Sequence, residues 1–329
     1  IYFGQNPKCC RHIIWALTRK RKSQEGLLIQ MDATPFAWFG NTEKFSLHGA
    51  IDDATGKIVG LYLTKNECLQ GYFEVTRQVL LSHGVPVSIY ADRHSIFRSP
   101  KADKLSIEEQ LAGKVVNDTQ FQRAMRELGI TIIPARSAQA KGRVERLWDT
   151  LQSRLPVEFK IAGITNLDDA NAFLARYIPI FNEKFAVEPA NPQPAYTQIK
   201  EDICIDNILC FKQTRTIDNG GVFSFRGKYF QPVSNGSIAT IPPRSQIHVL
   251  ISPVFGVRIQ FKNDVYDVVP FIKSKKTAKP NPSKEKTTYR PPENHYYKYG
   301  KQLWPKLSFA ESHCDILNML EEIFLKKYA

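Results

Sequence analysis

The sequence has few cysteines and no long apolar run, and these absences exclude several classes of protein. Its six cysteines are scattered over 329 residues without a C-x2-C or H-x3-H pair, which argues against a zinc site. Free thiols in a reducing compartment are the better interpretation. No run approaches the roughly 18 apolar residues that a membrane helix needs, and nothing like a signal peptide precedes the first strand-like segment. Since the chain begins with Ile1, we interpret it as part of a longer protein.

The middle of the chain lacks the charge excess that the whole sequence carries. The net charge is +13, but residues 27–271 are nearly neutral. Residues 1–26 contain six Lys or Arg against one Glu, and residues 272–306 contain ten against two acids. Two basic arms beside a neutral body favour binding to a polyanion such as DNA. Solvated tails are the alternative.

Strand-like and helix-like segments alternate between residues 27 and 185. Strands are expected at 27–33, 45–51, 57–64, 87–91 and 130–133, and helices at 70–83, 118–128, 139–155 and 167–185. The D-D-A-T-G sequence at 52–56 is typical of a hairpin turn and forces antiparallel pairing at one side of the sheet. The pattern therefore predicts an α/β fold with a mixed five-stranded sheet and helices on both faces.

The remaining segments differ in composition from this core. Residues 1–26 are expected to form a basic linker, and residues 186–205 a second linker. Closely spaced turn signals at 206–271 predict a small all-β barrel. A basic, aromatic linker follows at 272–308. A capping box predicts a C-terminal helix within 309–329.

Three acidic residues are candidates for a metal site. Asp32 and Asp92 each follow an apolar strand, and Glu145 lies on an amphipathic helix. Three carboxylates that converge repel one another unless cations join them, and hard oxygen ligands suit Mg²⁺ or Mn²⁺. Two such ions serve in-line phosphoryl transfer. Acids at strand ends are also common without such a role, so spacing alone leaves both interpretations open.

Several long strings carry a resemblance to a known family. They are MDATPFAWFG (31–40), GAIDDATGKIVG (49–60), GYFEVTRQVLLSHGVP (71–86), YADRHSIF (90–97), TQFQRAMRELGI (119–130), SAQAKGRVERLWDTLQSRL (137–155) and FNEKFAVEP (181–189). Between about 25 and 200 the chain resembles integrase-type DDE transposases of bacterial insertion sequences, in particular the ISNCY-type group.

The resemblance implies an RNase H-like, retroviral integrase-type core that cleaves and transfers DNA strands at transposon ends. It implies that Asp32, Asp92 and Glu145 form the catalytic triad and hold two Mg²⁺ or Mn²⁺ ions. Two features depart from the family pattern. Asp92 and Glu145 are 53 positions apart, which is more than in retroviral relatives, because residues 98–118 form a polar insertion. The N-terminal helix-turn-helix region of full-length members is missing or reduced to the stub before Arg19, so the resemblance does not imply that this chain recognises transposon ends by itself.

Basic residues near the acids and on the arms are candidates for DNA contacts. They are Arg93, His94, Arg136, Lys141, Arg143 and Arg146, together with Arg19, Lys20, Arg21, Lys22, Lys273, Lys275 and Lys276 on the arms. Solvated or loop-structural roles are the alternatives. We interpret Asp52 and Asp53 as turn residues, and Trp38 and Trp148 as core residues.

These features predict a protein that acts on double-stranded DNA, both transposon ends and target, in the bacterial cytoplasm and nucleoid. We expect no membrane association. A homo-oligomer on DNA is expected, because two ends must be cut together. Two other functions remain open: a catalytically silent DNA-binding relic or regulator on the same fold, and an RNase H-like nuclease acting on damaged or hybrid nucleic acid.

Overall fold

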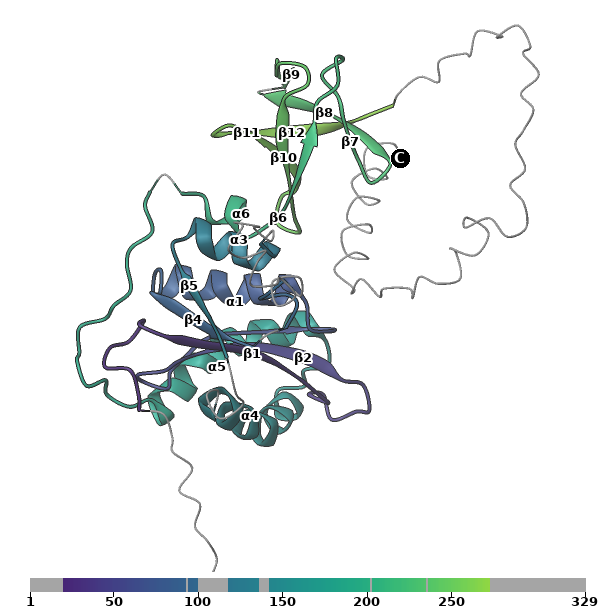
Figure 1. The fold of residues 1–329 in the computed structure, drawn as a ribbon. Coiled ribbons are helices and arrows are strands. Elements are labelled where there is room, and N and C mark those ends of the chain that lie inside the picture. Colours follow the sequence, from purple (N-terminus) through teal and green to yellow (C-terminus); the bar gives the residue numbers. More distant parts are fainter. Residues whose placement is uncertain are drawn as a thin grey trace, which may run out of the picture.

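The computed structural model describes residues 20–92, 94–99, 118–135, 142–201, 203–234 and 236–272. Within these ranges the chain forms an α/β unit followed by an all-β unit (Figure 1). None of the helices described is long and apolar enough to cross a membrane. The helix predicted within 309–329 lies outside the described residues.

The α/β unit is built on a mixed sheet. Its strands are β1 (Ile29–Phe36), β2 (Phe45–Asp52), β3 (Ile58–Thr64), β4 (Ser88–Ala91) and β5 (Thr131–Pro134). Their order is β3-β2-β1-β4-β5. The β1, β2 and β3 pairings are antiparallel, whereas β4 pairs parallel with both β1 and β5. This confirms the predicted mixed five-stranded sheet.

Helices cover both faces of this sheet (Figure 1). They are α1 (Leu69–Ser82), α3 (Gln120–Glu127), α4 (Gly142–Ile161) and α5 (Leu167–Phe185). Side chains alternate along a strand, so Ile29 and Met31 of β1 pack in one core with α1 and α3. The opposite core joins Leu47 and Ile51 of β2 to α4 and α5. The predicted placement of helices on both faces is confirmed.

Two helices, α3 and α4, differ from their predicted bounds by more than one residue. The helix α3 was expected to begin at 118, but Thr119 is its N-cap and forms a capping box with Gln122. The helix α4 was expected to end at Leu155, before Pro156, but it continues to Ile161. Phe159 in this extension is 1% exposed, so apolar packing offsets the cost of an internal proline.

Primary amide side chains cover the outer edge of β3. Asn182 accepts from the backbone N–H of Ile58 (2.7 Å) and donates to the carbonyl of Ile58 (2.8 Å). Asn171 makes the same pair of bonds with the backbone of Leu63, at 2.7 and 3.0 Å. Gln78 of α1 pairs with Leu61 in this way, at 2.9 Å for both bonds. These amides occupy backbone groups that an edge strand otherwise exposes.

The all-β unit is a seven-stranded antiparallel sheet. After the short helix α6 (Ile205–Ile208) come β6 (Phe211–Thr216), β7 (Phe223–Phe225), β8 (Lys228–Ser234), β9 (Ser237–Ile238), β10 (Gln246–Ser252), β11 (Gly256–Phe261) and β12 (Asp264–Phe271). Arg226 and Gly227, at φ 51° and 77°, form the tight turn between β7 and β8. The sheet curls around its own apolar core into a nearly closed, barrel-like shape, as predicted.

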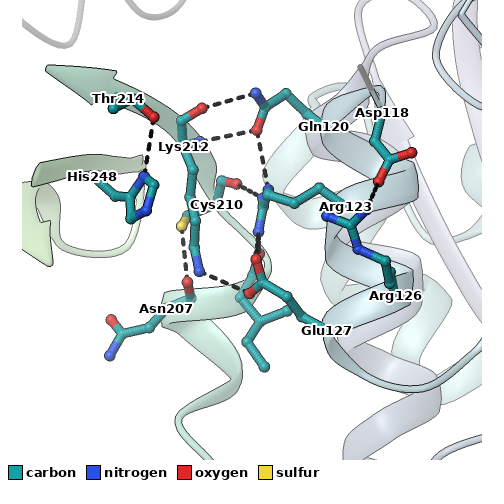
Figure 2. Close-up of polar contacts among 11 residues, drawn as sticks. Asp118, Gln120, Arg123, Arg126, Glu127, Asn207, Cys210, Lys212, Thr214 and His248 are labelled. Atoms are coloured by element: carbon teal, nitrogen blue, oxygen red, sulfur yellow. Dashed lines mark hydrogen bonds and ion pairs between the residues drawn. The ribbon is translucent and has the colours of Figure 1, made fainter. Parts of the chain in front are cut away.

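Polar contacts join α3 to the start of the barrel (Figure 2). The Gln120 amide pairs with both backbone groups of Lys212, at 2.8 and 3.0 Å. Arg123 donates to the carbonyl of Cys210 at 2.5 Å. Burial opposes ionisation of Glu127, but Lys212 and Arg123 outweigh it and lower the pKa of this carboxyl. The barrel is therefore anchored to the α/β unit by charged and amide groups.

Candidate active site

Asp32 and Asp92 lie on neighbouring parallel strands. In the β1–β4 register, Ile29 pairs with Ile89 and Gln30 with Tyr90. Continued by two residues, this register places position 32 beside position 92. Asp32 is within β1, and Asp92 directly follows β4. Asp32 and Asp92 therefore occupy neighbouring positions on adjacent strands, where β4 ends.

Tyr72 of α1 is a buried phenol whose surroundings are negatively charged. Burial raises the pKa of its hydroxyl well above the usual value, and the negative charges of Glu67, Asp32 and Asp92 add to this effect. The hydroxyl donates a 2.6 Å hydrogen bond to Glu67 Oε1. The charges of both aspartates thus reach one buried phenol. Tyr72 and Glu67 were not singled out in the sequence.

Trp148 of α4 holds the Asp32 side chain. Its indole Nε1 donates to Asp32 Oδ2 at 3.2 Å. Gly49 pairs with Asp32 across the β1–β2 ladder, and a Cβ at position 49 would lie 2.6 Å from Trp148 Cη2. Glycine is therefore required beneath the ring. Trp148 is a core residue, 6% exposed, as predicted, but its N–H also orients a candidate ligand.

A series of polar contacts aligns α4 with β1. Gln30 Oε1 accepts from the backbone N–H of Val144 at 3.3 Å, and Gln152 Nε2 donates to Thr34 Oγ1 at 3.2 Å. The Trp148–Asp32 contact lies between them along the chain. Four helical residues rise about 6 Å and two strand residues about 6.6 Å, so the contacts recur in step along both elements. The helix that carries Glu145 therefore runs beside the strand that carries Asp32.

Glu145 is exposed in the first turn of α4. An acidic side chain is favourable there because unpaired N–H groups give a helix N-terminus a partial positive charge. In the part of the chain that the structure describes, no three His, Cys, Asp or Glu side chains form a group that could hold a metal ion. Coordination of one ion by Asp32, Asp92 and Glu145 therefore stays a prediction.

Arg143 is held inside the molecule. Its Nε donates to Asp53 Oδ1 at 2.8 Å, and only 12% of its side chain is exposed. Asp53 was interpreted as a turn residue, but it also reaches helix α4. The structure gives Arg143 an internal partner, and a contact of Arg143 with DNA stays a prediction.

The other predicted DNA contacts in the described ranges lie at the surface. Lys20, Arg21, Lys22 and His94 are exposed, as is Arg146, whose Nε donates to the carbonyl of Gly142 at 2.9 Å. Partial burial and the nearby guanidinium of Arg143 lower the pKa of Arg21, and Arg146 adds to this effect. Three arginines thus gather near the start of α4. Arg19, Arg93, Arg136, Lys141, Lys273, Lys275 and Lys276 lie outside the described residues.

His94 also contributes to the geometry of Asp92. Its backbone N–H donates to Asp92 Oδ1 at 2.9 Å, and its Nδ1 lies 4.0 Å from Glu67 Oε1. The backbone contact of His94 could be anticipated from the sequence, because His94 lies just after an acid at the end of a strand. Gln30 and Gly49 carried no comparable signal in the sequence, because their roles depend on where α4 packs.

Two curated proteins are similar to this chain in sequence. The transposase for insertion sequence IS1202 of Streptococcus pneumoniae is 34% identical over 292 residues, covering 85% of this chain and 60% of that protein. The chain is related to bacterial insertion-sequence transposases. The putative transposase y4bF of Sinorhizobium fredii (strain NBRC 101917 / NGR234) is 38% identical over 209 residues, 63% of this chain and 44% of that protein. The resemblance seen in the sequence is confirmed, and the chain spans less than two thirds of either transposase.

Two solved structures of viral proteins are similar to this chain. The simian T-cell lymphotropic virus intasome in complex with PP2A regulatory subunit B56 gamma gives a TM-score of 0.38 at 16% identity, covering 76% of this chain and 78% of that chain. The HTLV-2 integrase catalytic core domain in complex with magnesium gives 0.32 at 20% identity, covering 45% and 83%. No protein-family profile matches the chain.

Proposed function

We propose that this transposase relative contains the catalytic core of an enzyme that cleaves DNA at transposon ends and joins the ends to target DNA. The observation that carries the proposal is the placement of Asp32 and Asp92 on adjacent parallel strands, with the helix that bears Glu145 aligned along β1. This placement supports a shared site for the three acids.

The residues present fit a divalent metal site. Asp32 lies in β1 and Asp92 directly follows the adjacent parallel strand β4, and both offer the hard oxygen donors that divalent cations prefer. Asp32, Asp92 and Glu145 would hold Mg²⁺ or Mn²⁺, two ions in all. Such ions activate a water or 3′-hydroxyl and stabilise the leaving oxygen in phosphoryl transfer.

The chain itself orients its acids and supplies positive charge. Trp148 fixes the Asp32 carboxylate through its N–H, and the His94 backbone does the same for Asp92. Arg146 and Arg21, both exposed, would contact DNA phosphates near the start of α4. Phosphate contacts set the position of the duplex without reading its sequence.

Double-stranded DNA is the proposed partner, and we propose that subunits assemble on it. Two transposon ends bound together raise the local concentration of the subunits. Light scattering of the chain with and without paired end DNA tests this assembly. A monomer in both conditions would contradict it.

A nicking and joining assay tests the proposed chemistry. The chain would be incubated with supercoiled plasmid and with duplexes bearing the inverted repeats that flank its coding sequence, in Mg²⁺ and in chelator. We expect metal-dependent products from the wild type, and none above background from Asp32→Asn, Asp92→Asn or Glu145→Gln. Asp267→Asn, an exposed residue of the barrel, is the control and should behave as wild type.

The same assay separates the proposed enzyme from its alternatives. DNA binding without metal-dependent cleavage would indicate a silent relic or regulator. Cleavage restricted to hybrid or damaged strands, without joining, would indicate a nuclease. Normal activity of Glu145→Gln would show that the assignment of the three acids is wrong.

A further inference from the structure

Asp53 is a fully buried carboxylate in the β2–β3 hairpin, with 0% of its side chain exposed. Its neighbour Asp52 closes the turn. Asp52 Oδ2 accepts from the backbone N–H groups of Ala54 (3.0 Å) and Thr55 (2.8 Å) and from the Thr55 hydroxyl (2.9 Å). These bonds shape the turn through one of its two adjacent acids. The charge of Asp53 has partners elsewhere.

The contacts of Asp53 lead to β1, to the segment before it and to α4. Its Oδ1 accepts from Arg143 Nε and from Gln30 Nε2, both at 2.8 Å. Its Oδ2 accepts from the backbone N–H of Lys22 at 2.9 Å. A buried charge is costly unless it is paired and hydrogen-bonded, and Asp53 is both. Three chain segments therefore meet at this carboxylate.

Gln30 extends this network to the backbone of α4. Its amide donates to Asp53, and its Oε1 accepts from the N–H of Val144 at 3.3 Å. The first four N–H groups of a helix have no partner within the helix. Gln30 provides one from a neighbouring strand. Asp53 and Gln30 thus hold two consecutive residues of the first turn, Arg143 and Val144, and Glu145 is the next residue.

We infer that Asp53 is a positioning residue for Glu145, acting through Arg143 and Gln30 on the first turn of α4. The inference rests on the proposed function and adds the part of the molecule that fixes the third acid. Asp32 and Asp92 are placed by the sheet itself. Glu145 is exposed on a helix and needs a separate anchor at its own end of that helix.

A buried ion pair is better suited to fixing the position of a neighbouring residue than to stabilising the fold. Replacing such a pair with neutral groups is often harmless to stability, whereas removing one partner leaves an uncompensated charge. Such a pair contributes by holding its two side chains in a fixed geometry. Displacement of a reacting group by about 1 Å costs about 100-fold in rate, and loss of a residue that orients a metal ligand costs about 10- to 100-fold.

The test uses Asp53→Asn, which keeps the size of the side chain and all positive charges. We expect amide hydrogen exchange in the peptide covering 142–150 to rise about tenfold, the equivalent of roughly one hydrogen bond. Peptides from β4 and from the barrel should be unchanged. This readout requires neither metal nor DNA.

The metal requirement of strand cleavage is the second readout. A misplaced ligand raises the Mn²⁺ concentration that gives half-maximal rate, by about tenfold or more. A merely structural defect lowers the amount of active protein and leaves that concentration unchanged. The salt dependence of DNA binding should stay as in wild type, because no cation is removed.

Asp267→Asn is the matched control. Arg258 Nε lies 2.9 Å from Asp267 Oδ1, nearly the same geometry as Arg143 and Asp53, but 71% of the Asp267 side chain is exposed. We expect no change in exchange or metal requirement. If Asp53→Asn fails to fold, Asp53→Asn/Arg143→Met leaves no buried charge unpaired and should show the same two effects.

Wild-type exchange in 142–150 and a wild-type metal requirement in either variant would overturn the inference. Faster exchange with an unchanged metal requirement would also overturn it, because the first turn would then be ordered without placing Glu145. If the wild type cleaves no DNA, the proposed function fails, and unchanged exchange would still show that Asp53 does not order this turn.

Discussion

Helices α4 and α5 cover the same face of the five-stranded sheet but are attached to it in opposite ways. In α5, the helix supplies the polar side chains: Asn171 and Asn182 bond the backbone of the edge strand β3. In α4, side chains of the central strand take part: Asp32 accepts from Trp148, and Gln30 accepts from the α4 backbone.

The α5 contacts hold the fold together, whereas the α4 contacts arrange the candidate site. The α5 amides satisfy backbone groups that otherwise face solvent or another strand, and they touch none of the candidate acids. The α4 contacts orient Asp32 and anchor the turn before Glu145. Disrupting α5 should therefore cost stability, and disrupting α4 should cost activity.

The largest effect on stability is expected at α5. Asn182→Leu keeps the shape of the side chain but leaves the N–H and carbonyl of Ile58 without their partner, at a cost of about 2–4 kcal/mol. Thermal or urea unfolding measures this loss, and cleavage per folded molecule should be unchanged. Glu183→Gln, an exposed neighbour, is the control. An equal fall in activity per folded molecule would show that α5 also arranges the candidate site.

On the opposite face of the sheet, which α1 covers, a buried histidine should make the stability of the fold depend on pH. His48 of β2 accepts from the backbone N–H of Cys68 at 3.2 Å, at the start of α1. Burial lowers the pKa of His48 to about 4, below its ordinary value near 6.5. Between these two pKa values, His48 is therefore protonated in the unfolded chain and neutral in the folded chain.

This stability is fully present above about pH 6.5 and is lost as pH falls toward 4, by up to about 3 kcal/mol. Unfolding measured across that range should show a shallower slope for His48→Gln than for wild type. His248→Gln, on the exposed side of the barrel, should retain the wild-type slope. Identical slopes for wild type and His48→Gln would exclude His48 as the cause.

A smaller effect on stability, together with a loss of activity, is expected at α4. Trp148→Phe removes the N–H that orients Asp32 and leaves a small cavity over Gly49, so cleavage per folded molecule should fall about tenfold, with about 1–3 kcal/mol of stability lost. Trp38→Phe is the matched control, because its indole donates to the carbonyl of Phe45 at 2.9 Å. That variant should lose stability and keep its activity; the reverse pattern would contradict the account.

The smallest effect is expected on the outer face of α4. Arg146→Gln should reduce the slope of log affinity for duplex DNA against log salt by about 0.9, the value for one phosphate contact. Lys160→Gln, exposed in the last turn of the same helix, should leave the slope unchanged. Equal slopes for all three proteins would remove Arg146 from the proposed DNA contacts.

The sheet could be predicted because it depends on local patterns. The apolar strand that ends before Asp92 and the hairpin turn at Asp52 are visible in the sequence, whereas β1 does not end at Asp32 as expected but continues to Phe36. Period and turn chemistry are visible without tertiary contacts. The extension of α4 past Pro156 was missed because burial of Phe159 decides it.

The supporting contacts of the site could not be predicted for the same reason. Gln30, Gly49 and Asp53 take their roles from where α4 packs against β1 and the hairpin. Gln30 lies in a strand as an ordinary polar residue, and Asp53 lies in a sequence typical of a turn. Only the packed arrangement shows that Asp53 faces Arg143.

We propose that Asp32, Asp92 and Glu145 hold the metal ions of a DNA-cleaving centre. Anomalous diffraction from crystals of the chain with Mn²⁺ and duplex end DNA would locate these ions. We expect Mn²⁺ peaks at coordination distance, about 2.0–2.6 Å, from the carboxylates of Asp32 and Asp92, with Glu145 joining them. Mn²⁺ bound elsewhere, or no peak between these acids in a chain that cleaves DNA, would contradict the account.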